Sequence, residues 1–180
     1  MNAAEKQPFS VCFSGHRPEK LPDGSMLRML LSLLFREIEN AVRAGAETFY
    51  TGCAPGIDLW AADMVNLLRN KYPSLRLICV LPYEKHGKRL RGDVRYHYQT
   101  VLRAADGIVT VVQDYSRSCY RMRNQYMIAH SQQLIAVVTD MRSGTGQTIR
   151  LAEAAGLTAR IVSMEAAAAQ RTYAHEYLKF

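Results

Sequence analysis

One stretch of the sequence decides the fold: Thr48-Phe49-Tyr50-Thr51-Gly52-Cys53-Ala54-Pro55-Gly56-Ile57-Asp58-Leu59-Trp60. It joins a strand-like run of aromatic and β-branched residues to a helix through a glycine turn. Gly52 and Gly56 let the chain turn tightly and approach a ligand, and Pro55 has no N–H to leave unpaired at a helix start. A helix beginning here directs free N–H groups and a partial positive charge beyond the strand. The pattern predicts a strand–turn–helix unit that suits a phosphate or another nucleotide oxygen.

The composition is that of one globular domain. The chain has 180 residues, of which 48% are hydrophobic and 22% charged, enough for one well-formed core. No apolar run has the length of a membrane span, and residues 1–8 lack the apolar core of a signal peptide, so we expect a cytoplasmic protein without a membrane partner. The four cysteines form no CxxC pair, and no metal site is expected.

The charge of the chain allows two interpretations. Its formal net charge is +7, with basic residues concentrated at 85–91 and at Arg117, Arg121 and Arg123. Such a surface attracts polyanions, including nucleic acid. A solvated basic face explains the same residues equally well, and the sequence leaves both interpretations open.

Strand and helix patterns alternate along the chain. Apolar runs predict strands over residues 9–14, 47–51, 75–81 (closed by Pro82), 107–112, 134–139 and 159–163. Apolar residues at helical spacing predict helices between them, including 27–42 and 149–155, and an alanine-rich helix follows the last strand. Strands that are almost wholly apolar indicate a mostly parallel sheet buried on both faces. We therefore expect an α/β fold: one doubly wound, Rossmann-like domain over 9–163, with a peripheral helix over 164–180.

In such a fold, ligands bind beyond the carboxyl ends of the strands. Polar and glycine residues follow several of the predicted strands, and we take them as candidate ligand-binding residues: Ser14, Gly15, His16, Arg17, Thr51, Gly52, Gly56, Asp58, Tyr83, Arg123, Asn124, Gly144, Thr145, Gly146 and Thr148. The main-chain amides around Gly52–Gly56 and Gly144–Gly146 are expected to open into one shared anion pocket.

Individual candidates have specific expected roles. The planar fork of Arg17 suits a phosphate or carboxylate. Asp58 suits ribose hydroxyls or a base amine, although an acid in a first helical turn is also stabilised by the helix dipole alone. Thr145 or Thr148 is expected to cap the helix that follows and to offer a hydroxyl. No lysine follows the last glycine of this loop, so P-loop NTP hydrolysis is not supported.

Several of these residues together resemble the YpsA-like proteins of the SLOG superfamily. The resemblance rests on Ser14-Gly15-His16-Arg17-Pro18, on Gly52-Cys53-Ala54-Pro55-Gly56-Ile57-Asp58 followed by Leu59-Trp60-Ala61-Ala62, and on Pro82-Tyr83, Ala105-Asp106 and Arg123-Asn124 with Met127. It covers roughly residues 9–163. That superfamily also contains the DprA/Smf proteins and the lysine-decarboxylase-like LOG phosphoribohydrolases. The resemblance implies a Rossmann-like domain that binds a nucleotide or a nucleotide-derived ligand.

The resemblance does not extend to a complete catalytic set. Arg123 and Met127 keep the arginine–methionine spacing of the LOG enzymes, but the Ser143–Thr148 loop has only an approximate glycine–threonine pattern. Ile149 and Arg150 stand where the enzymes place an acid. Cleavage of an N-glycosidic bond needs a carboxylate that stabilises the developing sugar cation or activates water. No catalytic residue is assigned, and whether the protein is an enzyme stays undecided.

Three functions follow from the sequence, in order of preference. The first is sensory or regulatory binding of a nucleotide, with NAD or an ADP-ribose-like molecule as candidate ligand. The second is a nucleotide phosphoribohydrolase in which Arg123 binds phosphate and Asp58 or Glu153 acts as acid or nucleophile. The third is single-stranded DNA binding of the DprA type, which the net charge favours and the scarcity of aromatics among the basic residues does not. A homo-oligomer is compatible with each.

Overall fold

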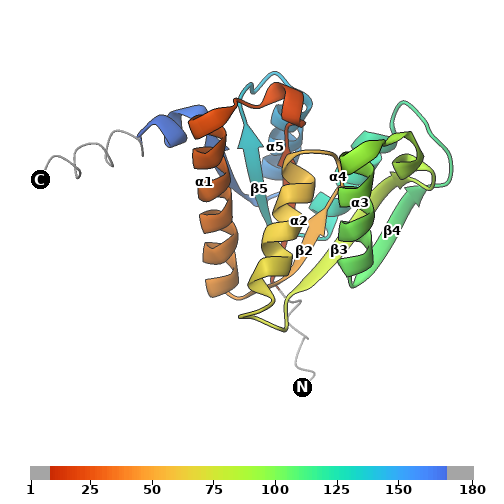
Figure 1. The fold of residues 1–180 in the computed structure, drawn as a ribbon, viewed down its shortest axis with the longest axis horizontal. Coiled ribbons are helices and arrows are strands. Elements are labelled where there is room, and N and C mark those ends of the chain that lie inside the picture. The colour runs from red at the N-terminus through yellow and green to blue at the C-terminus, as the bar shows by residue number, and fades with distance from the viewer. Residues whose placement is uncertain (1–8, 170–180) are drawn as a thin grey trace, which may run out of the picture.

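A computed structural model describes residues 9–169, and Figure 1 shows their fold. The six strands are β1 (Phe9–Gly15), β2 (Ala46–Thr51), β3 (Arg76–Tyr83), β4 (Gly107–Val112), β5 (Gln133–Val138) and β6 (Thr158–Ser163). They form one sheet in the order β4-β3-β2-β1-β5-β6. Every neighbouring pair is parallel, which confirms the expected α/β fold.

Helices cover both faces of the sheet. They are α1 (Gly24–Arg43), α2 (Ile57–Leu68), α3 (Gly92–Ala104), α4 (Cys119–Ala129) and α5 (Gly144–Ala154), with short 3₁₀ turns at Pro18–Lys20 and His86–Arg89. The first three lie on one face, and α4 and α5 lie on the other (Figure 1). None of the described helices combines the length and the apolar character needed to cross a bilayer.

Alternation along the strands divides the core into two layers. Val11 and Phe13 of β1 are fully buried beneath α1 and α2, where Phe13 stacks on Phe49 with ring centroids 5.9 Å apart. The intervening Cys12 faces the other layer and packs with Leu134 and Ile149. Successive strand residues point to opposite faces, so the apolar run Val11–Phe13 at the centre of β1 is buried on both faces.

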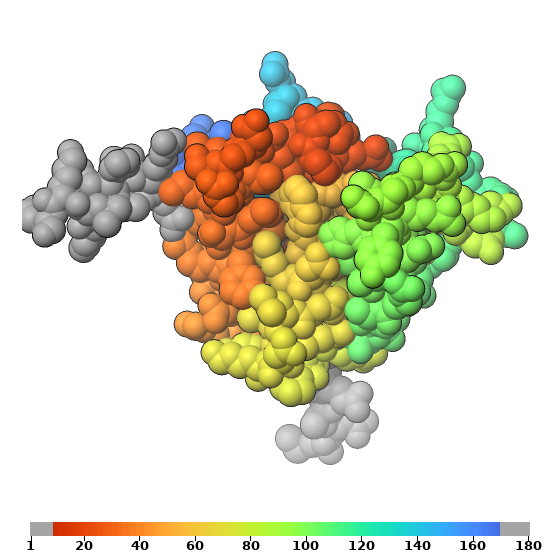
Figure 2. Space-filling view, viewed as in Figure 1, coloured from red at the N-terminus to blue at the C-terminus, as the bar shows by residue number. Residues whose placement is uncertain are grey.

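The connections diverge on either side of β1. The chain leaving β1 crosses to β2, whereas the chain leaving β4 passes to β5 on the opposite side of β1. The loops after β1 and β5 therefore separate at the carboxyl edge and open a crevice between two neighbouring strands. In Figure 2 the chain that follows β1, drawn red, and the light-blue chain that follows β5 lie at the same edge of the molecule.

The structure corrects three details of the sequence-based fold. β3 continues through Pro82, because Tyr83 pairs with Val112 of β4 and the ladder tolerates one residue without an N–H. The edge strands are not buried on both faces, since Ile108 in β4 is 52% exposed and Ile161 in β6 is 41% exposed. Helix α5 begins at Gly144 and not at Ile149, because the glycine–threonine segment forms its first turn.

The predicted C-terminal helix falls only partly within the described residues. Residues 164–169 are helical. The Ser163 hydroxyl accepts a hydrogen bond from the Ala166 N–H at 3.2 Å, and Ala167 is fully buried in the same core layer as α1 and α2. The remainder of the prediction, residues 170–180, lies outside the described residues.

Candidate ligand-binding site

A cleft of about 710 Å³ opens at the crevice between β1 and β5. Its walls come from the chain after β1, from the start of α4 and from the start of α5. The residues that line it are Ser14, Gly15, His16, Arg17, Lys20, Ala54, Arg117, Tyr120, Arg121, Arg123, Asn124, Ser143, Gly144, Thr145, Gln147, Thr148, Arg150 and Leu151. This volume lies within the range of about 300–1,000 Å³ typical of sites for cofactor-sized ligands.

Most of the candidate residues meet at this cleft. Those that line it are Ser14, Gly15, His16, Arg17, Arg123, Asn124, Gly144, Thr145 and Thr148. The candidates outside its lining are Thr51, Gly52, Gly56, Asp58, Tyr83 and Gly146. Sequence reasoning did not select Lys20, Ala54, Arg117, Tyr120, Arg121, Ser143, Gln147, Arg150 and Leu151 as site residues. The basic cluster at Arg117 and Arg121 was the one available signal for this group.

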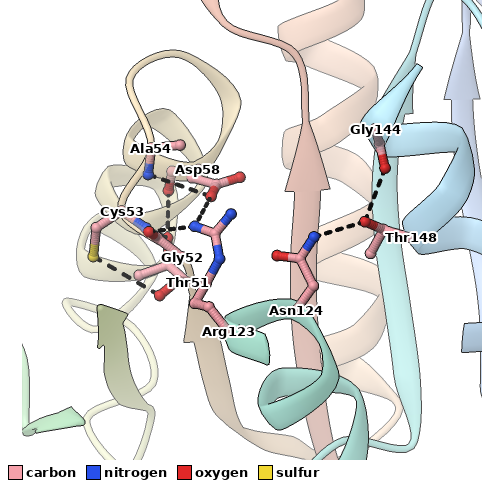
Figure 3. Close-up of polar contacts among 9 residues, drawn as sticks. All are labelled: Thr51, Gly52, Cys53, Ala54, Asp58, Arg123, Asn124, Gly144 and Thr148. Carbon is pink, nitrogen blue, oxygen red and sulfur yellow. Dashed lines mark hydrogen bonds and ion pairs between the residues drawn. The ribbon is translucent and has the colours of Figure 1, made fainter. Parts of the chain in front are cut away.

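Arg123 is held by the glycine loop that follows β2. Its Nη1 donates to the Gly52 carbonyl at 2.6 Å and lies 3.5 Å from Oδ2 of Asp58. Figure 3 shows the guanidinium between this loop on one side and the Asn124–Thr148 pair on the other. Arg123 is 8% exposed, so the loop fixes a nearly buried cation at the wall of the cleft.

Asp58 makes two contacts within the protein itself. Its Oδ2 accepts a hydrogen bond from the Ala54 N–H at 3.3 Å and faces Arg123, and the residue is 4% exposed. Burial raises the pKa of Asp58, and the Arg123 charge opposes that rise. The carboxylate therefore supports the loop and Arg123. Asp58 does not belong to the lining of the cleft, and its contact with ribose hydroxyls or a base amine stays a prediction.

Close approach explains the two glycines of the same loop. A Cβ at Gly52 would collide with the Arg123 guanidinium. Gly56 has a φ of +95°, and a Cβ there would lie 2.6 Å from the His16 carbonyl. That carbonyl accepts a hydrogen bond from the Ile57 N–H at 3.3 Å. The glycines thus allow the β2 loop to pack against the β1 loop and the arginine.

The expected shared amide pocket is only half formed. The Cys53 N–H donates to the Thr51 hydroxyl at 3.3 Å, and the N–H groups of Ala54 and Ile57 are bound to Asp58 and His16. Of this loop, Ala54 alone reaches the lining of the cleft. The loop after β2 acts as a support for Arg123, and its bonded amides are not a phosphate cradle.

The start of α5 does face the cleft. Ser143 is the cap: its hydroxyl accepts from the Gly146 N–H at 3.3 Å and its carbonyl from the Gln147 N–H at 3.0 Å. The N–H groups of Gly144 and Thr145 precede the first intrahelical bond and have no intrahelical acceptor. The prediction that Thr145 or Thr148 caps this helix is wrong, because Ser143 occupies the capping position.

Thr148 instead links the two helices that begin at the cleft. Its hydroxyl donates to the Gly144 carbonyl at 3.0 Å and accepts from Nδ2 of Asn124 at 2.8 Å (Figure 3). Asn124 belongs to α4, so this pair ties the second turn of α4 to the second turn of α5. Two helix N-termini, each with a partial positive charge, are held at one cleft.

Two nitrogen atoms at the cleft wall lack partners. Nε2 of His16 and Nε of Arg123 are buried without a hydrogen bond to any described residue. Burial, followed by the nearby Lys20 charge, lowers the pKa of His16, so its imidazole is neutral near pH 7. Buried nitrogens of this kind are rarely left unsatisfied. The Nε–H of Arg123 is a donor and fits an oxygen acceptor, whereas Nε2 of a neutral His16 donates or accepts according to its tautomer.

An aromatic cluster adjoins the cleft. Tyr83, at the end of β3, packs edge-on against Tyr115, Tyr120 and His86, with ring centroids 5.5, 6.4 and 5.6 Å apart. Of these rings only Tyr120 lines the cleft, and the Arg123 guanidinium carbon lies 6.0 Å from its centroid. The predicted site residue Tyr83 is 4% exposed and contacts Tyr120 without lining the cleft itself.

Comparison with known proteins identifies the family. The YpsA family model, described as the YspA SLOG family, matches residues 11–160. The chain belongs to this family. Similar proteins include the uncharacterized SPbeta prophage-derived protein YoqJ of Bacillus subtilis, 28% identical over 72% of this chain and 82% of its own. A UPF0398 protein of Bacillus cereus is 26% identical over 77% of this chain and 79% of its own.

Solved structures support the same fold. DNA processing protein A from Helicobacter pylori, whose structure describes a single-stranded DNA binding mode, superposes with a TM-score of 0.57 and 22% identity over 86% of this chain. DprA from Streptococcus pneumoniae gives 0.60 and 17% over 85%. This chain spans 65% and 50% of those two chains. At these identities the likeness establishes the fold alone.

Proposed function

We propose that this SLOG-family protein binds a nucleotide or nucleotide-derived ligand, through its phosphate, in the cleft between β1 and β5. The observation that carries the proposal is Arg123, which lines the cleft. Its guanidinium is nearly buried and anchored by Gly52 and Asp58, and its Nε has no partner among the described residues. An anchored arginine loses little side-chain entropy on binding and is suited to phosphate recognition.

The surrounding groups extend this anion site. Gly144 and Thr145, whose N–H groups have no intrahelical acceptor, line the cleft at the start of α5. Arg17 lines the side of the cleft that follows β1. Tyr120 offers a half-buried ring on which a nucleobase can stack next to the phosphate groups. Ligands with both a base and a phosphate, NAD and ADP-ribose among them, match this combination.

The side chains that line the cleft support ligand binding without catalysis. The two carboxylates considered for N-glycosidic cleavage are Asp58, which is buried against Arg123, and Glu153, which is exposed on α5. Neither belongs to the described lining of the cleft. A hydrolase of that class needs a carboxylate beside the sugar, and we therefore propose a sensory or regulatory role.

The test is calorimetric titration of the protein with AMP, NAD and ADP-ribose. We expect at least one of them to bind, and Arg123→Gln to weaken binding at least about tenfold, since a charge-assisted hydrogen bond is lost. Arg103→Gln, an identical change on the far helix α3, is the matched control and should bind as the wild type does. Circular dichroism checks that both variants fold. Failure of all three compounds to bind would contradict the proposal.

Single-stranded DNA is the second candidate ligand. It is favoured by the basic lining of the cleft and by the SLOG fold shared with the DNA-binding Helicobacter pylori protein. Binding of an oligothymidine should then weaken steeply with salt, with a slope of about −0.7 for each phosphate neutralised. A salt-independent signal, or none, in a fluorescence anisotropy titration would exclude this candidate.

A further inference from the structure

Cationic side chains from three elements surround the cleft. They are Arg17 and Lys20 after β1, Arg117 just before α4, Arg121 and Arg123 in α4, and Arg150 in α5. Among the described residues that line the cleft there is no Asp or Glu. The starts of α4 and α5 add the partial charges of two helix dipoles. The cleft is therefore a concentration of positive charge that its own walls do not balance.

Among the described residues, an ion pair with a carboxylate balances one of these six cations, Arg123. Arg123 faces the Asp58 carboxylate, and Nη1 of Arg150 donates to the Met141 carbonyl at 2.9 Å, which carries no net charge. Asp140 lies near His16, but its Oδ1 is bound to Nε of Arg142 at 3.2 Å. Within residues 9–169 no ion pair joins an acid to the remaining cleft cations.

The number of cations in the cleft indicates how much negative charge a ligand should carry. Like charges gathered in one cleft repel one another, and the repulsion is relieved in proportion to the negative charge that enters. One phosphate monoester brings at most two negative charges, which leaves several of the cations unbalanced. Because the cations stand on three sides of the cleft, an elongated anion reaches more of them than a compact one does.

We infer that the ligand carries a chain of linked phosphates with three or more negative charges, as in a nucleoside diphosphate or triphosphate. The inference rests on the proposed nucleotide-binding function and narrows it. It places the phosphate chain among Arg17, Arg121, Arg150 and the start of α5, next to Tyr120. Since no carboxylate lines the described cleft, Mg²⁺ would compete with the arginines for phosphate oxygens and should weaken binding.

The experiment compares AMP, ADP, ATP and inorganic tripolyphosphate by calorimetry in metal-free buffer near neutral pH. Affinity should rise at least about fivefold with each added phosphate and fall with salt, because each phosphate pairs with further cations. Tripolyphosphate should displace ATP, and excess Mg²⁺ should weaken ATP binding.

Matched variants locate the effect. Arg121→Gln and Arg150→Gln should each weaken ATP binding about tenfold and AMP binding less than about threefold, because the removed charge faces the distal phosphates. Arg95→Gln removes the same charge from an exposed position on α3 and should leave both affinities unchanged. Thermal unfolding of each variant separates a lost charge from a lost fold.

The results of these titrations distinguish a failure of this inference from a failure of the proposed nucleotide-binding function. If AMP binds as tightly as ATP, or if tripolyphosphate fails to displace ATP, the inference is wrong and nucleotide binding stands. If AMP, ADP and ATP all fail to bind while NAD or ADP-ribose binds, the inference is wrong and the proposed function stands. If NAD and ADP-ribose fail as well, the proposed function fails with it. If a short oligothymidine binds and ATP does not displace it, the inference is overturned in favour of a nucleic acid.

Discussion

At the scale of the residue, the ionisable groups near the cleft are tuned by burial. Asp58 is stabilised as a carboxylate by Arg123 against the cost of its burial. His86, packed between Tyr83 and Tyr98, is 5% exposed and its Nδ1 has no partner among the described residues. Burial, together with the charges of Arg123 and Arg17, lowers the pKa of His86 from 6.5 to about 4.

The lowered pKa of His86 predicts that the protein loses stability in mild acid. The unfolded chain takes up a proton on this residue below pH 6.5 and the folded chain only below about pH 4. The free energy of unfolding therefore falls as pH decreases through this interval, by about 1–2 kcal/mol between neutral pH and pH 5. His86→Phe should remove that part of the loss, measured by urea unfolding at the two pH values. His16, whose pKa is also lowered, contributes a further loss that remains in this variant.

The control for this prediction is His97→Gln, at a partly exposed position on α3 where the imidazole contacts Asp63. The acid-dependent loss should persist in that variant. An equal loss in the wild type and in His86→Phe would show that His86 is not its source.

At the scale of the element, the proposed function gives the start of α5 two roles through one residue, the stability of the helix and the binding of the ligand. Ser143 accepts from the Gly146 N–H, and the N–H groups of Gly144 and Thr145, two residues that line the cleft, have no intrahelical acceptor. A helix N-terminus prefers an acidic or hydroxyl cap, whereas a phosphate ligand tolerates only the uncharged one. The two roles can therefore be separated by substitution.

Ser143→Ala should lower the free energy of unfolding by about 1 kcal/mol, since the cap is lost. Ser143→Asp restores a capping acceptor and should be as stable as the wild type, yet its charge repels phosphate and should weaken nucleotide binding at least about tenfold. Chemical denaturation and calorimetry measure the two effects independently. Undiminished nucleotide binding by Ser143→Asp would mean that phosphate does not approach this helix start.

At the scale of the whole molecule, residues after the last strand belong to the core. Ala167 is fully buried, whereas its neighbour Ala166 is exposed. The chain from 164 to 169 therefore packs onto the layer formed by α1 and α2 and is part of the domain that the sheet organises.

Ala167→Asp should destabilise the protein by about 2–4 kcal/mol, because it buries a charge without a partner. Ala166→Asp adds the same group at an exposed position in the first turn of that helix and should change stability by less than about 0.5 kcal/mol. Thermal denaturation compares the two variants. Equal stability of both would mean that this segment does not pack on the core in solution.

Local patterns in the sequence determined the α/β class, the alternation of elements and the glycine loop, because strand and helix periodicity and turn chemistry depend on neighbouring residues. The same patterns predicted that the residues after β1 and at the starts of α4 and α5 lie at one edge of the sheet, because the carboxyl ends of parallel strands share that edge. The order of the strands decided the rest. It placed Arg123 against Gly52 and Asp58, far apart in the chain, and thereby turned a predicted phosphate loop into the support of an arginine. Such contacts depend on which elements become neighbours after folding, and only the tertiary structure contains that information.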